Sequence, residues 1–439
     1  MMKNYNPVSA QDYLPRELLR EIQLQRLQKI VAHEYEHVPV YRARMDERGV
    51  KPSHIKSLKD IALLPFMMKK DLRDTYPFGL FAMNMSDVVR LHASSGTTGK
   101  PIVVGYSKED IDVWVSCMMR SLVAAGVGQG DIIQNSYGYG LFTGGLGAHY
   151  GIENLGATVV PTSGGNTERQ VMLMRDFGVT GITCTPTYFI HLCEKALQMG
   201  LDVRDFPIRV GLFGAEPWTE EMRKRIEALS GVEAFDIYGL SEMSGPGVGI
   251  ECECHNGLHI FEDHFYPEII DPDTCEVLPD GEEGELVFTT ISKYGMPMIR
   301  YRTRDITHII NEPCSCGRTI RRIARISRRS DDMFIIRGVN VFPSQVESAL
   351  LAVEGSMPHY RIILTRRPDG LDNMTIEVEI SGEFDKIKTL EELQAKFSHS
   401  VERILGIHAV IKMVPPNTIP RSEGKAKRVF DNRMNSNNQ

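Results

Sequence analysis

The chain has 439 residues, which at about 150 residues per domain predicts two or three domains. Its 50 Lys and Arg residues against 57 Asp and Glu give a net charge of −7, with no block of like charge, which argues against a nucleic-acid partner. No stretch approaches the ~18 apolar residues that span a bilayer, and the first residues lack a signal-peptide pattern. The eight Cys are too few for a disulfide scaffold. We therefore expect a cytoplasmic protein that binds small molecules, with no membrane or nucleic acid as a partner.

The hydrophobic pattern predicts a helical start followed by alternating strands and helices. Apolar residues recur at helical spacing over 16–45, and from about residue 88 short β-branched runs alternate with amphipathic stretches. The expected elements are strands at 131–137, 157–162 and 181–186 and helices at 167–178 and 187–199. Such alternation is typical of α/β units.

The pattern changes after Gly249 to β-rich sequence with turn signals such as HNG and PDGEEGE. Within 328–340, RRSDDMFIIRGVN, two adjacent acids separate an Arg-rich strand from a new apolar strand, and we place a domain boundary there. The fold class is therefore α/β. We expect a large N-terminal α/β domain with a β-rich subdomain, residues 1–331, and a small mobile C-terminal α+β domain, residues 332–439.

One metal motif occurs in the expected N-terminal helix. His33-Glu34-Tyr35-Glu36-His37 matches H-E-x-x-H, which on a helix places two His one turn apart to bind zinc. A catalytic zinc also needs a third protein ligand and a cleft, and the following VPVYRARM offers only a basic amphipathic face. We therefore interpret this segment as a solvated helix face.

A Gly-rich segment, residues 94–100, has the chemistry of a phosphate-binding loop. Small hydroxylated residues and glycines let backbone N–H groups and hydroxyls face phosphate oxygens, and a lysine adds a positive charge. The spacing does not fit a Walker A loop, because the two glycines are three residues apart and Pro101 follows the lysine. The residues are Ser94, Ser95, Gly96, Thr97, Thr98, Gly99 and Lys100.

The segment S-S-G-T-T-G-K-P resembles the phosphate loop of the adenylate-forming superfamily, which includes acyl-CoA synthetases, nonribosomal adenylation domains and luciferases. Further motifs follow in that family's order: the adenine-side loop Gly214-Ala215-Glu216, the Y-G-x-[ST]-E signature in 236–242, the Y-x-T-G-D segment in 301–305, the hinge in 329–332 and the lysine loop in 420–425. The resemblance covers nearly the whole chain.

Three long segments resemble the phenylacetate-CoA ligase branch of that superfamily: 136–157, 261–272 and 330–347. Two positions depart from the superfamily pattern, since Arg304 and Arg328 stand where the motifs carry Gly. Both replace a permissive backbone with a bulky cation, which puts the loop conformation in doubt.

The resemblance implies adenylation of a carboxylic acid by ATP, in which two anions must be brought together and cations must screen them. Glu242 is implied to bind Mg²⁺, and Lys425 to bridge the acyl oxygen and the α-phosphate as the catalytic lysine. The nucleotide contacts implied are Ser94 to Lys100, Ala215, Glu216, Asp236 to the adenine amino group, Tyr238 stacked on adenine, Gly239, Asp305 to the ribose hydroxyls and Arg329. Coenzyme A is the implied second substrate, reached when the C-terminal domain rotates about Asp331 and brings 337–342 to the pantetheine tunnel.

The resemblance also implies an aryl or arylacetate monocarboxylic acid. Small residues beside aromatic ones form a slot for a planar ring, and no Arg or Lys stands among them to pair a second carboxylate. The pocket positions are Tyr137, Phe142, Ala148, Gly214, Ala215, Ile237 and Pro246.

Several alternatives stay open. A related ligase could activate an indole, benzoate or aminobenzoate type of acid, and a nucleotidyltransferase could use adenylation without coenzyme A. An accessory protein without turnover is a third alternative, against which the retained Lys425 and Glu242 count. No motif decides the oligomeric state, and a homodimer is one assembly considered.

The last prediction concerns a structural Zn²⁺. Asn256-Gly257 predicts a two-residue hairpin turn that places Cys254 opposite His259, so that these two and Cys252 share a face. Cys314-Ser315-Cys316-Gly317 brings two more thiols on a tight turn. Following relatives that carry the second pair, we choose Cys252, His259, Cys314 and Cys316 as ligands, with Cys254 as the substitute. The alternative is four reduced cysteines in separate strands.

Overall fold

The computed structural model describes residues 6–93, 101–326, 328–330, 332–337, 339–367, 372–380, 387–422 and 426–433. The chain divides into two compact units. The first unit contains Met1–Cys184, Phe206–Ala215 and Glu233–Ile326, and the second contains Thr185–Asp205, Glu216–Val232 and Ser327–Gln439. Within the described ranges, none of the helices combines the length and the apolar character that a bilayer crossing requires.

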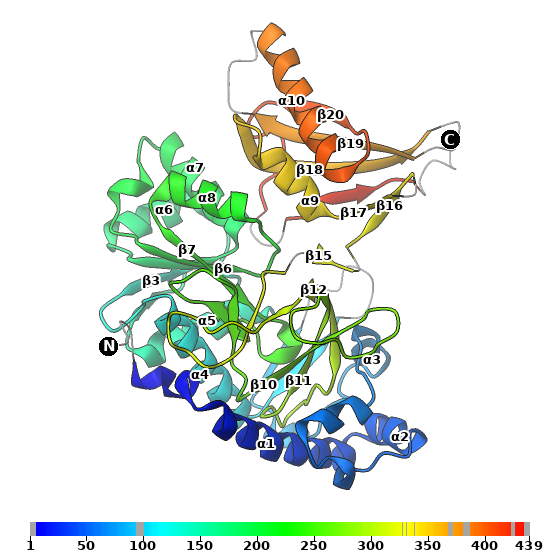
Figure 1. Ribbon diagram of the computed structural model, residues 1–439. Helices are drawn as coiled ribbons and strands as arrows, with labels where there is room; N and C mark the ends of the chain where they lie inside the picture. Colours follow the sequence, from blue (N-terminus) through cyan, green and yellow to red (C-terminus); the bar gives the residue numbers. More distant parts are fainter. Residues whose placement is uncertain are drawn as a thin grey trace. The chain divides into compact units, whose positions relative to one another are not determined.

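The helical pattern over 16–45 gives two helices of the first unit, α1 (Arg16–His37) and α2 (Pro39–Glu47) (Figure 1). Pro39 has no N–H to donate and a fixed φ, so it begins the second helix instead of continuing the first. The other helices of the unit are η1 (Pro7–Tyr13), η2 (Pro52–His54), η3 (Leu58–Leu63), α3 (Lys69–Asp74), η4 (Met85–Asp87), α4 (Lys108–Ala124), α5 (Thr143–Leu155), α6 (Thr167–Asp176) and η6 (Ser241–Met243).

A nine-stranded sheet forms the centre of the first unit, in the order β13-β14-β9-β8-β7-β6-β5-β3-β4. The strands from β4 to β7 are parallel, and the pairs from β7 to β13 are antiparallel. Their bounds are β3 (Ile132–Asn135), β4 (Thr158–Val160), β5 (Gly181–Cys184), β6 (Val210–Gly214), β7 (Glu233–Tyr238), β8 (Gly249–Glu251), β9 (Leu258–Ile260), β13 (Ile309–Ile310) and β14 (Arg322–Ile323). The three strands expected at 131–137, 157–162 and 181–186 are confirmed as β3, β4 and β5.

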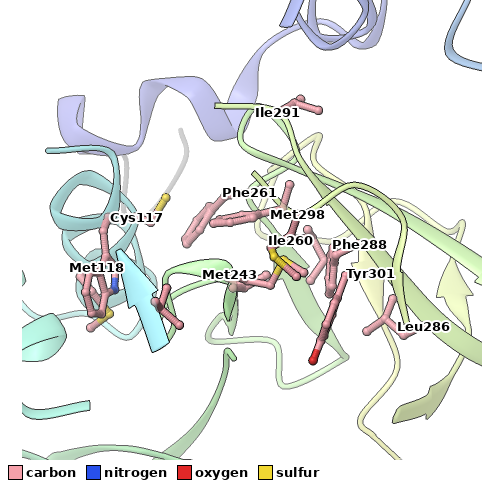
Figure 2. Close-up of a cluster of buried hydrophobic side chains, with 14 of the residues drawn as sticks. Cys117, Met118, Met243, Ile260, Phe261, Leu286, Phe288, Ile291, Met298 and Tyr301 are labelled. Carbon is pink, nitrogen blue, oxygen red and sulfur yellow. The ribbon is translucent and has the colours of Figure 1, made fainter. Parts of the chain in front are cut away.

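The β-rich sequence after Gly249 also forms the antiparallel strands β10 (Phe265–Ile270), β11 (Gly284–Thr290) and β12 (Tyr301–Thr307), which lie side by side (Figure 1). A separate antiparallel pair, β1 (Arg90–Ala93) and β2 (Val103–Tyr106), flanks the expected phosphate loop. Figure 2 shows part of the core of this unit, where Phe261, Met298 and Phe288 pack together and the Tyr301 hydroxyl points out of the cluster.

The second unit contains an α+β fold. Its four-stranded sheet has the order β20-β19-β18-β21, with an antiparallel central pair and parallel outer pairs. Phe397 of the amphipathic α10 belongs to the same buried hydrophobic cluster as Ile362 and Ile376 of this sheet. The elements are α7 (Pro186–Gln198), η5 (Val203–Asp205), α8 (Glu220–Ser230), β15 (Arg328–Arg329), β16 (Phe334–Ile336), β17 (Val339–Val341), α9 (Pro343–Leu351), β18 (Ser356–Arg366), β19 (Asp372–Ile380), α10 (Ile387–Leu405), β20 (Val410–Val414) and β21 (Val429–Asp431). The mixed α/β class is therefore confirmed.

The H-E-x-x-H segment lies near the end of α1. His33 Nε2 is 3.0 Å from the Tyr294 carbonyl oxygen, and His37 Nδ1 is 2.9 Å from the His33 carbonyl oxygen. Glu34 between them is fully buried, and neither of its carboxylate oxygens has a hydrogen-bond partner among the described residues. Burial raises the pKa of Glu34 well above its ordinary value.

This buried acid predicts a stability that falls as pH rises. The folded state keeps the Glu34 proton at a pH where the unfolded state has lost it, so stability is lost from the unfolded pKa up to the folded one. Glu34→Gln removes this titration, so the stability of the variant relative to the parent should increase between pH 5 and 8. The increase should be about 1.4 kcal/mol for each unit by which the pKa of Glu34 in the folded state exceeds its pKa in the unfolded state. Urea unfolding at both pH values measures this. Glu36→Gln, exposed on the same helix, is the matched control, and an equal response of the two variants would contradict the prediction.

Candidate active site

The expected phosphate loop, Ser94 to Lys100, lies outside the described residues, as do Asp331 and Lys425. The chain enters and leaves the loop at adjacent strands, with Ala93 opposite Val103. His92 is buried just before the loop, and its Nδ1 lies 3.0 Å from the Leu141 carbonyl oxygen. Burial lowers the pKa of His92, so its ring is neutral at pH 7.

The structure brings together two residues expected to bind opposite parts of the nucleoside. The Tyr238 hydroxyl, at the end of β7, donates a hydrogen bond of 2.6 Å to Oδ2 of Asp305 on β12. Asp305 is buried and its backbone N–H donates to Thr303 Oγ1. A carboxylate has about four acceptor positions, so Asp305 can accept further hydroxyl donors while it holds Tyr238.

Asp236 lies two residues earlier on the same strand. Its backbone N–H donates to Glu251 Oε2 at 2.8 Å, and its Oδ2 is 3.8 Å from Nε of Arg325. A carboxylate oxygen accepts hydrogen bonds, which is the property that an amino group requires.

Glu242 lies on η6 and is 6% exposed. The Tyr301 hydroxyl donates to its Oε1 at 3.3 Å. The carboxylate is a hard oxygen ligand of the type that Mg²⁺ prefers, so the residue fits the expected role. Lys293 donates from Nζ to the Glu242 carbonyl oxygen at 2.8 Å, and its burial lowers its pKa to about 8 against the opposing charges of Asp110 and Glu242.

The adenine-side loop begins at the end of β6. Gly214 pairs with Ile237 of β7, and Ala215 follows in a left-handed conformation, with φ 68°. Gly239 follows β7 directly. Glu216 belongs to the second unit, where its Oε1 accepts hydrogen bonds from the Thr187 N–H at 2.9 Å and hydroxyl at 2.6 Å.

The two arginines that depart from the superfamily pattern have different surroundings. Arg304 has φ 68°, the left-handed conformation that favours the glycine of the motif. Its Nη1 lies 3.4 Å from Oε2 of Glu285, which Arg302 also contacts at 2.6 Å. In the second unit, the Arg328 guanidinium lies 5.3 Å from the centre of the Phe342 ring, and Arg329 Nε lies 3.7 Å from Asp332 Oδ2.

The expected acid-pocket residues all lie in the first unit. A Cβ at Gly144 would be 2.5 Å from the Phe142 ring and 3.2 Å from the Tyr137 ring, so both aromatic residues flank this glycine. Three residues later on the same helix, a Cβ at Gly147 would be 2.4 Å from Trp114 and 3.1 Å from Pro246. Tyr137, Ala148 and Ile237 are buried, and Phe142 is 36% exposed. The aromatic rings therefore pack directly against the glycines of α5.

A cluster of sulfur and imidazole ligands lies in the β-rich part of the first unit. The ligand atoms of Cys252, His259, Cys314 and Cys316 all lie within 4.8 Å of one another. Cys252 Sγ is 3.7 Å from Cys314 Sγ, and Cys316 Sγ is 3.4 Å from His259 Nε2. His259 Nδ1 lies 3.3 Å from the Ile320 carbonyl oxygen, which orients Nε2 toward the cysteines.

The hairpin expected at this cluster is wrong in its register. His259 pairs with Ile250 instead of Cys254, and β8 and β9 are joined by residues 252–257. The Cys252 carbonyl oxygen accepts from the His255 N–H, so the chain already turns before Asn256-Gly257. Cys254 consequently lies outside the cluster, with its Sγ 3.1 Å from the Ser315 hydroxyl.

The sequence analysis does not identify three residues that contact η6 and Glu242. Tyr106 and Lys293 contact the carbonyl groups of η6, and Tyr301, although it belongs to the Y-x-T-G-D segment, was assigned no role. The apolar residues that precede Tyr106 are a local signal for a buried strand, but no residue near Lys293 in the sequence signals that a lysine is buried there.

Comparison with known proteins identifies the class. Residues 29–293 match the family model described as "AMP-binding enzyme", and residues 338–433 match "AMP-binding enzyme C-terminal domain". The structure is similar to a 2-hydroxyisobutyryl-CoA ligase in the postadenylation state, with a TM-score of 0.92 and 30% identity, covering 99% of this chain and 95% of that one. The chain is thus an AMP-forming acid–thiol ligase of the adenylate-forming superfamily.

Two curated relatives define the branch. A phenylacetate-coenzyme A ligase of Pseudomonas putida is 51% identical over 95% of each chain, and one of Thermus thermophilus is 49% identical over 95% of this chain and 97% of the relative. The chain belongs to the phenylacetate-CoA ligase family.

The left-handed conformation of Arg304 predicts an unusual order of stabilities. Both Arg304→Gly and Arg304→Ala remove the guanidinium group, but only glycine relieves the strain of the left-handed backbone. The Gly variant should therefore be more stable than the Ala variant by about 1 kcal/mol. Urea unfolding of the two variants measures the difference. An Ala variant as stable as the Gly variant would show that the position carries no such strain.

Proposed function

We propose that the enzyme activates phenylacetate or a close aryl relative with ATP and transfers the acyl group to coenzyme A. The observation that carries the proposal is the hydrogen bond from Tyr238 to Asp305, because it joins the residues expected at the adenine and at the ribose. The flanking of Gly144 by two aromatic rings supports a planar acid. The names of the relatives from two bacteria support the choice of acid.

In the first half-reaction, the carboxylate attacks the α-phosphorus of ATP and pyrophosphate leaves, giving an acyl-adenylate. Within the first unit, Asp236, Tyr238, Gly239 and Ala215 would hold the adenine side and Asp305 the ribose side. The roles of Glu216 at the adenine and of Arg329 at the ribose come from the family resemblance. Bound at Glu242, Mg²⁺ would neutralise phosphate charge. The roles of Ser94 to Lys100 and of Lys425, which would stabilise the charge that develops at the α-phosphate, come from the family resemblance.

In the second half-reaction, the thiol of coenzyme A attacks the acyl carbonyl and AMP leaves. We propose that residues 332–439 form the mobile domain and that Asp331 is the hinge that exchanges Lys425 for 337–342. A hinge needs a residue that can absorb a large backbone change. A homodimer and a cytoplasmic location stay proposals as well, and light scattering after size-exclusion chromatography tests the first.

A panel of acids tests the function directly. Pyrophosphate release should be fastest with phenylacetate or a close aryl acid, and AMP with free thioester should appear only with coenzyme A. A preference for long aliphatic acids would contradict the acid assignment. Turnover without coenzyme A would favour the adenylyltransferase alternative.

A variant of the pocket supplies the control for this panel. Phe142→Ala should raise KM for the aryl acid about tenfold or more, as expected for a lost hydrophobic contact of about 1–3 kcal/mol, and change KM for ATP little. Phe142 is partly exposed, so its loss should not unfold the protein.

We further propose that the cluster of Cys252, His259, Cys314 and Cys316 binds a structural Zn²⁺. Three thiols and one imidazole are a ligand set of structural zinc sites. The His259 hydrogen bond to the Ile320 carbonyl oxygen is the outer contact that such an imidazole commonly makes. The ligands join the β8–β9 connection to residues 314–316, so the ion would stabilise the β-rich part instead of taking part in catalysis.

Elemental analysis of protein purified without added metal should find one zinc per chain, and Cys314→Ser should lose the metal and lower Tm because metal binding is coupled to folding. Cys254→Ser is the matched control, since Cys254 lies outside the cluster. Zinc well below one equivalent, with Cys314→Ser as stable as the parent, would exclude the site.

A further inference from the structure

Lys293, which follows β11, is almost completely buried, with 2% exposure. Its Nζ donates to the Glu242 carbonyl oxygen at 2.8 Å and lies 4.7 Å from the centre of the Tyr106 ring. Burial of a charged ammonium group is costly, and a methionine of similar length would avoid this cost. The carboxylates of Asp110 and Glu242 favour its ionised form, and the hydrogen bond that its Nζ makes goes to the backbone carbonyl group of Glu242.

The hydrogen bond from Lys293 to η6 has a counterpart one residue earlier in that helix. The Tyr106 hydroxyl donates to the Ser241 carbonyl oxygen at 2.8 Å, so two successive carbonyl groups of η6 accept from buried side chains. The preceding carbonyl group, of Leu240, accepts instead from the backbone N–H groups of Met243 and Gly245. A single turn of 3-10 helix satisfies few of its own carbonyl groups, so the side chains complete its hydrogen bonding.

These donors act on the backbone that presents Glu242. Ser244, directly after η6, has φ 70°, so the turn ends in a conformation that must be held by its surroundings. The Tyr301 hydroxyl holds the side chain of Glu242 from the other end, at 3.3 Å from Oε1. Backbone and carboxylate are thus each fixed by a separate group.

We propose that Lys293 is a positioning residue for adenylation, which holds the η6 backbone so that the Glu242 carboxylate faces the Mg²⁺ of the nucleotide. This inference rests on the proposed role of Glu242 as the magnesium ligand. Lys293 acts through the Glu242 carbonyl group, and Tyr106 acts in the same way through Ser241. Outer contacts of this kind set the orientation of a metal ligand.

The test is binding of Mn²⁺, a spectroscopic substitute for Mg²⁺, in the presence of a nonhydrolysable ATP analogue, measured by electron paramagnetic resonance. Lys293→Met should weaken Mn²⁺ binding about 10- to 100-fold. Pyrophosphate exchange should fall with it, while the reaction of supplied acyl-adenylate with coenzyme A stays unchanged. Lys51→Met is the matched control, because Lys51 is half exposed and lies in a surface ion pair with Asp46.

Two further variants separate the possible results. Tyr106→Phe keeps the ring and removes the hydroxyl that donates to Ser241. It should therefore weaken Mn²⁺ binding, and it gives a result even if Lys293→Met does not fold. In a Glu242→Gln background, the Lys293→Met substitution should cost little more, because both act on the same ligand.

The inference is wrong if Lys293→Met and Tyr106→Phe both bind Mn²⁺ like the parent, whether or not the two substitutions lower Tm. If Lys293→Met is unfolded, normal Mn²⁺ binding by Tyr106→Phe is sufficient to overturn it. Normal Mn²⁺ binding by Glu242→Gln would instead contradict the proposed role of Glu242 itself. The failure of the inference and the failure of the proposed function are therefore distinguishable.

Discussion

The parallel pairing of β6 with β7 brings the ends of two strands that carry proposed nucleotide-binding residues to one edge of the sheet. Gly214 pairs with Ile237, so the residues that follow both strands emerge at the same edge of the sheet. On its other side β7 pairs antiparallel with β8, so the direction of neighbouring strands changes at β7. Ligands of open α/β sheets bind at the carboxyl ends of strands where the topology changes. Tyr238 is the last residue of β7, and Glu242 lies on η6, the next element in the sequence.

The sequence was sufficient to predict the class of fold and the order of the motifs. The apolar runs that became β3, β4 and β5 are short, bounded by turn residues and rich in β-branched side chains, so local pattern and final structure agree. The prediction of four metal-binding residues also agrees with a cluster in space, because two C-x-C pairs in β-rich sequence restrict the arrangements available. Local patterns are informative where the nearest neighbours in sequence are also the neighbours in space.

The sequence predictions fail where contacts between residues far apart in the sequence determine the structure. The turn at Asn256-Gly257 is a strong local signal for a two-residue hairpin. The chain instead turns earlier, over 252–257, and Cys252 lies 3.7 Å from Cys314, which is 62 residues away in the sequence. Lys293 in the sequence ISKYG looks like a solvated residue. Its burial depends on Glu242 and Tyr106, which precede it by 51 and 187 residues, respectively, so no local pattern could indicate it.

A buried charge network joins the segment after the sulfur cluster to the N-terminal segment of the first unit. Arg318, two residues after Cys316, donates to Asp12 of η1 at 3.1 Å. Arg120 of α4 donates to the same carboxylate at 2.8 Å and to both oxygens of Asp263. Burial alone would raise the pKa of Asp263, but its contacts with His264 and Arg120 hold it well below its ordinary value.

Removal of one partner from a buried network leaves an uncompensated charge, which costs about 3–5 kcal/mol. Displacement of residues 314–318 would therefore disturb Arg318 and, through Asp12, the contact between η1 and α4. The helix α4 also contributes Trp114, whose Nε1 donates to the Pro246 carbonyl oxygen at 2.8 Å beside the acid pocket. Order in the β-rich part and order in the proposed acid pocket are thus connected by α4.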